Sequence, residues 1–159
     1  MNKAAVLEAI LERLQADLTL YAKAADSARA EATDEQSKAE NKYDTRGLEA
    51  SYLARGQSRQ ARETETALEQ FATLARQPLT KPEVIGVGCL VELKTGRDTA
   101  CYFFGPRAGG TEVTVDGREI LVITSQSPLG KQLAGHRAGE KLLLEFGGQT
   151  REGRIVSIA

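Results

Sequence analysis

The sequence is poor in the residues on which most self-contained catalytic and metal sites depend. Its 159 residues include one histidine, two cysteines and no tryptophan. A single histidine, His136, disfavours both a histidine-based catalytic triad and a histidine-rich metal site. The two thiols, Cys89 and Cys101, lack a close metal-ligand spacing and lie in apolar, strand-like runs. We therefore expect both to be buried and reduced.

Long apolar runs and an excess of one charge are also absent. No apolar stretch approaches the roughly 18 residues that a membrane span requires. The N-terminal run MNKAAVLEAILERL is periodic, unlike a signal peptide. The net charge is −1, so contact with nucleic acid would depend on a local basic patch. We expect a cytoplasmic protein of one or two small domains with no membrane partner.

Proline is absent from residues 1–77, which contain only two glycines, Gly47 and Gly56. The remaining glycines and all four prolines follow residue 77. This change in composition predicts a helical region over 1–77, a linker over 78–83 and a second domain over 84–159. Pro78 and Pro82 would end the preceding helix.

Two apolar stripes with alternating steps of three and four run through the first region. The first comprises Leu7, Ile10 or Leu11, Leu14, Leu18, Tyr21, Ala25, Ala28 and Ala32. The second comprises Tyr52 or Leu53, Ala61, Thr64, Leu68, Phe71 and Ala75. Such stripes are typical of a coiled-coil seam, and two in one chain predict an antiparallel hairpin. Pairing large residues with large ones places the tip near residues 38–46, with arms on the order of 50 Å long.

The second region has the pattern of a small antiparallel β domain. Partly alternating, β-branched runs bounded by turn residues occupy 83–94, 99–105, 111–117, 118–124, 140–146 and 151–159. A short helix with proline in its first turn is expected over 128–134. The predicted fold class is therefore α+β, with an antiparallel α-helical coiled-coil hairpin before the β domain.

One segment of the β domain carries a family resemblance. ITSQSPLGKQLAGHRAGEKLLLEF, residues 123–146, resembles the C-terminal domain of the bacterial Gre (GreA/GreB) transcript-cleavage and elongation factors. The matching residues are Ser127, Pro128, Leu129, Gly130, Leu133, Gly135 and Gly139. The run VIGVGCLVEL is similar to the first strand of that domain. The resemblance implies a coiled coil followed by an FKBP-like domain, which is the order predicted above.

The resemblance also implies a partner and a mechanism. Gre factors dock their globular domain on RNA polymerase and send the coiled coil through the secondary channel toward the catalytic Mg²⁺. Acidic residues at the tip help to hold a metal ion while the polymerase hydrolyses the RNA. Carboxylates suit this role because Mg²⁺ prefers oxygen ligands and retains water. The chain itself would be no enzyme and would have no cofactor of its own, sharing only the polymerase Mg²⁺.

The tip matches the family motif in part. Glu40 and Asn41 agree with the family's Glu-Asn pair, whereas Ser37 stands where the family has Asp. Asp44 supplies a carboxylate from the other side of the bend, and Tyr43 is an aromatic residue at the apex. We therefore expect Glu40 and Asp44 to be the tip acids, which would bind a metal ion only jointly with the polymerase Mg²⁺. Further acids near this end are Asp34, Glu35 and Glu49; helix capping by Asp44 or Thr45 is the alternative explanation.

Basic residues form a second candidate site on the hairpin. Arg55, Arg59 and Arg62 have the spacing of one helix face, and Arg46 lies nearer the tip. The resemblance implies that they face nascent RNA, while a solvated face paired with acids is the alternative. For docking to the polymerase, the resemblance points to the turn that contains Ser127, Pro128 and Gly130.

Two outcomes follow for a Gre-like factor. Either Glu40 and Asp44 stimulate transcript cleavage, or the altered tip modulates initiation or pausing without cleavage, or competes with other factors that bind the channel. Ser37 favours the second outcome. In both, the chain would act as a monomer. The alternative from another class is a coiled-coil scaffold or adaptor that does not act on RNA polymerase. A prolyl isomerase would require an aromatic-lined pocket, which four Phe, four Tyr and no Trp disfavour.

Overall fold

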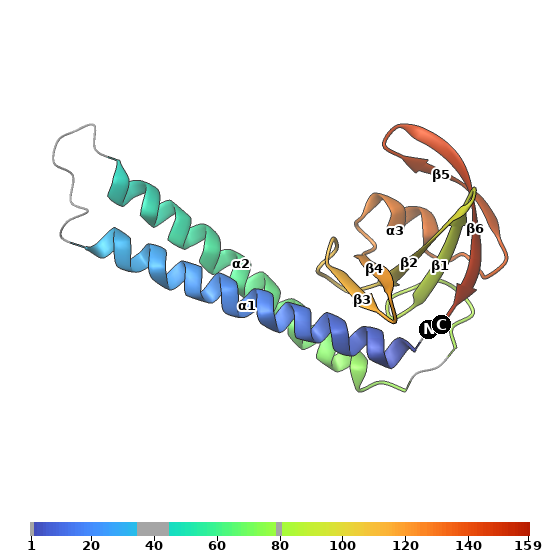
Figure 1. The fold of residues 1–159 in the computed structure, drawn as a ribbon, viewed down its shortest axis with the longest axis horizontal. Coiled ribbons are helices and arrows are strands. Elements are labelled where there is room, and N and C mark those ends of the chain that lie inside the picture. The colour runs from blue at the N-terminus through green and yellow to red at the C-terminus, as the bar shows by residue number, and fades with distance from the viewer. Residues whose placement is uncertain (1, 35–44, 79–80) are drawn as a thin grey trace. The chain divides into compact units, whose positions relative to one another are not determined.

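The computed structural model describes residues 2–34, 45–78 and 81–159. Two long helices, α1 (Lys3–Thr33) and α2 (Arg46–Ala75), precede a sheet of six strands and a short helix, α3 (Pro128–Leu133). Figure 1 shows α1 and α2 lying antiparallel beside one another. This architecture confirms the predicted α+β class with a helical hairpin first; the FKBP-like assignment stays a prediction. Among the described residues, no helix is long and apolar enough to cross a membrane.

The chain forms two compact units. One comprises residues 13–68, which are the middle and far parts of the two helices, and the other comprises residues 1–12 and 69–159. The first turns of α1 and the last turns of α2 thus belong with the sheet. The predicted boundary at 78–83 falls just after α2 ends, and residues 79 and 80 lie outside the described residues.

The seam of α1 agrees with its predicted stripe, and that of α2 agrees at Thr64 and Phe71 but not near its start. Ala25 and Ala28 are buried on α1, as the pattern predicted. On α2, either Tyr52 or Leu53 was expected in the seam, and instead they expose 63% and 54% of their surface. Small residues take their place, because alanine side chains let two helix backbones approach closely. The buried residues of α2 are Ala50, Ala54, Thr64, Ala67 and Phe71.

The strands are β1 (Leu90–Thr95), β2 (Asp98–Phe104), β3 (Glu112–Val115), β4 (Arg118–Ile123), β5 (Lys141–Phe146) and β6 (Gln149–Ile158). Their order in the sheet is β3-β4-β2-β1-β6-β5, so that β3 and β5 are the edges. Most neighbours are antiparallel, as predicted, but β2 and β4 are parallel. The reason is burial: β4 is apolar on both faces, with Ile120 and Val122 on one and Leu121 and Ile123 on the other, so β4 and not β3 occupies the inner position beside β2.

Side chains pack against parts of both faces of the sheet. On one face, a cluster around Val91, Leu93, Leu144 and Ile155 packs with Leu133 of α3. On the other, Phe71 of α2 meets Phe103 of β2 with 5.9 Å between ring centroids. Gly105 permits this approach, because a Cβ atom there would lie 2.7 Å from Phe71 Cζ. The last turn of α2 is thereby held against the sheet by close packing.

Candidate functional site

The acids expected at the tip fall largely outside the described part of the chain. Glu35, Glu40, Asn41, Tyr43 and Asp44 lie within residues 35–44, outside the described residues. Asp34 follows the end of α1 and is exposed. The assignment of Glu40 and Asp44 as metal-binding acids therefore stays a prediction.

Glu49, the remaining tip acid, belongs to the first turn of α2. Its Oε1 accepts a hydrogen bond of 2.8 Å from the Thr45 hydroxyl, and its amide donates to the Thr45 carbonyl at 2.9 Å. A carboxylate in a first helical turn is also favoured by the helix dipole. Glu49 therefore has a structural role at the start of α2, where Arg46 is the first helical residue.

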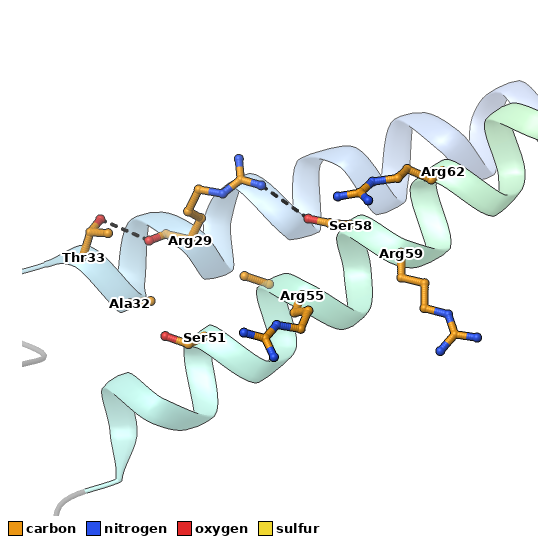
Figure 2. A pocket seen from close by; sticks show the side chains of 9 residues that line it. Arg29, Ala32, Thr33, Ser51, Arg55, Ser58, Arg59 and Arg62 are labelled. Atoms are coloured by element: carbon orange, nitrogen blue, oxygen red, sulfur yellow. Dashed lines mark hydrogen bonds between the residues drawn. The ribbon is translucent and has the colours of Figure 1, made fainter.

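The predicted arginine face lines a real groove. Figure 2 shows this groove on one flank of the hairpin, between the end of α1 and the first half of α2. Its floor consists of small side chains, including Ala32, Ala54 and Ser51. Four arginines line it, namely Arg29, Arg55, Arg59 and Arg62.

The arginines of the groove differ in how far their charge is compensated. Arg29 pairs with Asp26 at 3.3 Å and donates to the Ser58 hydroxyl at 3.3 Å (Figure 2), and Arg59 pairs with Glu63 at 3.0 Å. Within the described ranges, Arg55 and Arg62 form no ion pair. Exposed pairs of this kind are weak and exchange readily for an incoming anion. The groove is suited to phosphate groups, which guanidinium groups bind in a bidentate manner.

Two apolar residues continue the arginine face toward the start of α2. Leu48 and Tyr52 precede Arg55 and Arg59 in alternating steps of four and three, so that all four lie on one side of the helix. Leu48 exposes 56% of its surface and Tyr52 exposes 63%. An exposed aromatic ring beside arginines is the combination with which proteins bind single-stranded nucleic acid. Sequence reasoning missed this because it assigned Tyr52 to the seam.

The turn named for polymerase docking is built around Ser127. Its hydroxyl caps α3 by accepting from the Gly130 amide at 3.1 Å and donates to the Thr124 carbonyl at 2.8 Å. Pro128 occupies the first helical position and is exposed. Gly130 is buried, and a Cβ atom there would lie only 1.9 Å from the Thr124 carbonyl oxygen. Of the three predicted docking residues, Pro128 is thus the exposed one, and docking at this turn stays a prediction.

Two further glycines of the motif adopt backbone angles that other residues disfavour. Gly135, just after α3, has φ +79°, and Gly139, before β5, has φ +90°. Side chains rarely adopt these angles. The Gly139 amide also donates to the Ile155 carbonyl at 2.7 Å. The motif that carries the family resemblance therefore specifies how α3 joins the sheet, and its Leu133 is fully buried in the core.

The cysteines and the histidine that were considered for metal or acid-base chemistry are either buried or hydrogen-bonded within the domain. Cys89 and Cys101 are free and buried, which confirms the expectation for both. His136 Nδ1 donates to Glu140 at 2.6 Å, and this hydrogen bond holds the pKa of Glu140 below its ordinary value. Within the described ranges, no group of three or more His, Cys, Asp or Glu side chains is placed to hold a metal ion.

Comparison with known proteins gives the following matches. GreA factor homolog 1 (Gfh1) of Thermus thermophilus has 24% identity and a TM-score of 0.38, with 94% of each chain covered. A second structure of the transcription factor Gfh1 has 28% identity and a TM-score of 0.40, covering 94% of this chain and 93% of that one. The elongation factor GreA/GreB of Nitrosomonas europaea has 18% identity and a TM-score of 0.35, covering 60% and 78%.

No family model and no curated protein matches the chain. At the TM-scores found, the structural matches do not show that the chain belongs to either group.

Proposed function

We propose that this chain is a Gre-like transcription factor that binds RNA polymerase through its C-terminal domain. In this proposal the hairpin enters the secondary channel and brings its end toward the catalytic Mg²⁺, modulating elongation or initiation. The chain contributes no active site of its own and acts on nascent RNA only through the polymerase.

The observation that carries the proposal is the combination of two features in one chain. The Ser127 to Gly139 segment resembles the Gre factors at the residues that cap α3 and turn the chain back into the sheet. A helical hairpin precedes it, in the order that the resemblance implies. The arginine groove adds support, because phosphates of RNA are ligands that Arg55 and Arg62 can bind.

Co-purification with core RNA polymerase tests the proposal most directly. The full chain is expected to be retained by the immobilised polymerase, and a chain in which residues 13–68 are replaced by a short linker is expected to bind more weakly. Absence of binding by the full chain would exclude the proposed function.

The role of the tip acids is tested on stalled, backtracked elongation complexes. If Glu40 and Asp44 complete a metal site with the polymerase, the wild-type chain shortens the RNA, and Glu40→Ala with Asp44→Ala abolishes this. Since Ser37 replaces an acid of the family motif, we expect altered pausing or initiation without shortening. The control is Glu12→Ala with Glu65→Ala, which removes two exposed carboxylates from the same helices.

The arginine groove is tested with Arg55→Gln, Arg59→Gln and Arg62→Gln combined. We expect this variant to retain binding to polymerase lacking nucleic acid and to lose affinity for elongation complexes that contain RNA. Each lost phosphate contact lowers the salt dependence of binding by about 0.7 in the slope of log K against log salt. An unchanged slope would show that the groove does not contact RNA.

The scaffold alternative has one observation in its favour. Large apolar side chains lie exposed on the hairpin, namely Leu20, Leu48, Tyr52 and Leu53. Exposed apolar side chains are used in helix-to-helix contacts with a partner. Light scattering distinguishes the two functions, since a factor that enters a channel as a single hairpin is a monomer and a dimerising scaffold is not.

A further inference from the structure

Three cations lie directly opposite one another on three neighbouring strands. Lys94 of β1 is paired with Arg154 of β6, and Arg154 is paired in turn with Lys141 of β5. Directly paired residues point to the same face of a sheet, and all three are exposed. Strands are about 4.8 Å apart, so this cation row, Lys94–Arg154–Lys141, spans about 10 Å.

The cation row opposes the stability of the sheet. Like charges directly opposite one another on adjacent strands are destabilising. Only Lys141 is compensated, by Glu152 at 3.0 Å, with both side chains about two-thirds exposed. In the described part of the chain, Lys94 and Arg154 form no ion pair. Folding does not favour this arrangement of cations, so its presence is explained by a negatively charged ligand that binds them.

The row lies in an open hollow of the sheet surface. The β1–β2 turn borders it on one side and the β5–β6 hairpin on the other. Two more arginines, Arg97 and Arg151, line it, so that five cations face two carboxylates, Asp98 and Glu152. No described residue that lines the hollow is aromatic. A ligand held here would therefore be recognised by its charge, without stacking on aromatic side chains.

We propose that the cation row binds the phosphate groups of a nucleic-acid strand. Three of the five cations are arginines, whose planar groups match phosphate oxygens in pairs. A strand carries one phosphate per residue, at a rise of about 3.4 Å or more. Successive phosphates can therefore meet successive members of the row. Recognition would be independent of sequence, because no group in the hollow is placed to read base edges or stack on them.

The proposal does not rest on the function proposed above, because the row is on the sheet and the arginine groove is on the hairpin. The test compares two variants of the full chain. The row variant carries Lys94→Gln, Lys141→Gln and Arg154→Gln. Its matched control carries Lys81→Gln, Arg107→Gln and Lys131→Gln, which remove three other exposed cations of the same compact unit.

Fluorescence anisotropy with a labelled single-stranded RNA of about 20 nucleotides, at about 50 mM salt, gives the affinity. The row variant is expected to bind about tenfold or more weakly, with a salt slope lower by about 2. Its melting temperature is expected to be equal to or above that of the wild type, since repulsion is relieved. The control variant loses the same three positive charges and is expected to bind the RNA more tightly than the row variant.

Three outcomes would overturn the proposal. One is equal loss of RNA affinity in the row variant and the control, which would mean that net charge alone drives binding. The second is displacement of the RNA by polyglutamate as readily as by inorganic polyphosphate, which would indicate an acidic protein surface. The third is loss of all RNA binding in the Arg55, Arg59 and Arg62 variant alone, which would locate binding on the hairpin and refute the row while leaving the proposed function standing.

Discussion

Replacing Ser127 with alanine separates a structural role of the α3 turn from a role in docking. The Ser127 hydroxyl accepts from the amides of Gly130 and Thr124, at 3.1 and 3.2 Å, and donates to the Thr124 carbonyl at 2.8 Å. Loss of a helix N-cap costs about 1 kcal/mol. The amide of Thr124 also loses its side-chain partner in a half-buried site, which raises the cost to about 2 kcal/mol.

Urea unfolding followed by circular dichroism measures this cost. With a slope of about 2 kcal/mol per molar, a loss of about 2 kcal/mol lowers the urea midpoint by about 1 M. Ser127→Thr keeps the hydroxyl and should recover most of the difference, and Ser125→Ala, on an exposed neighbour without a cap, should change little. An unchanged midpoint for Ser127→Ala would refute the capping role.

Polymerase binding by the same variants then shows whether Ser127 also contacts the partner. If Ser127 acts only through the cap, Ser127→Ala binds the polymerase normally at temperatures where it is folded. A tenfold loss of binding without a loss of stability would make Ser127 a docking residue.

Two further predictions concern the packing and the titration of the domain. Gly105→Ala should lower the free energy of unfolding by about 1–3 kcal/mol, because its Cβ would lie 2.7 Å from Phe71 Cζ. Gly86→Ala, with open space around it, should have little effect. Urea unfolding of both variants measures the difference. His136→Gln should raise the pKa of Glu140 back toward 4.5, and an NMR titration of Glu140 measures this change. Because the folded-state pKa of Glu140 is lowered, the stabilisation by this pair is present at neutral pH and is lost as the pH falls through that lowered value. An unshifted Glu140 titration in the variant would contradict the assigned cause.

The helices and most strands follow from local pattern. Residues 1–77 hold two glycines and no proline, and their apolar steps of three and four require helices with one buried side. Turn residues such as Gly96 and Gly117, both with positive φ, divide the second half into strands. The start of β1 was predicted too early, at residue 83, because Gly88 with φ +90° interrupts the run that alternation suggested.

The α2 seam shows where local pattern is insufficient. The predicted stripe began at Tyr52 or Leu53, and both are exposed, whereas Ala54 is buried. Alanine residues are buried on α1 as well, at Ala25 and Ala28, and small side chains let two helices approach closely. Which of two possible stripes is buried depends on the partner helix.

The sequence by itself determined the α+β class, two long helices with an apolar stripe on each, and a short helix starting at Pro128, since each depends on residues close together in the chain. Only the tertiary structure decided the parallel pairing of β2 with β4, the groove that joins Arg29 to Arg55 and Arg62, and the row of Lys94, Arg154 and Lys141. These residues are far apart in sequence and individually resemble ordinary solvated charges. Strand register and helix packing bring them together, and no local periodicity encodes which distant cations become neighbours.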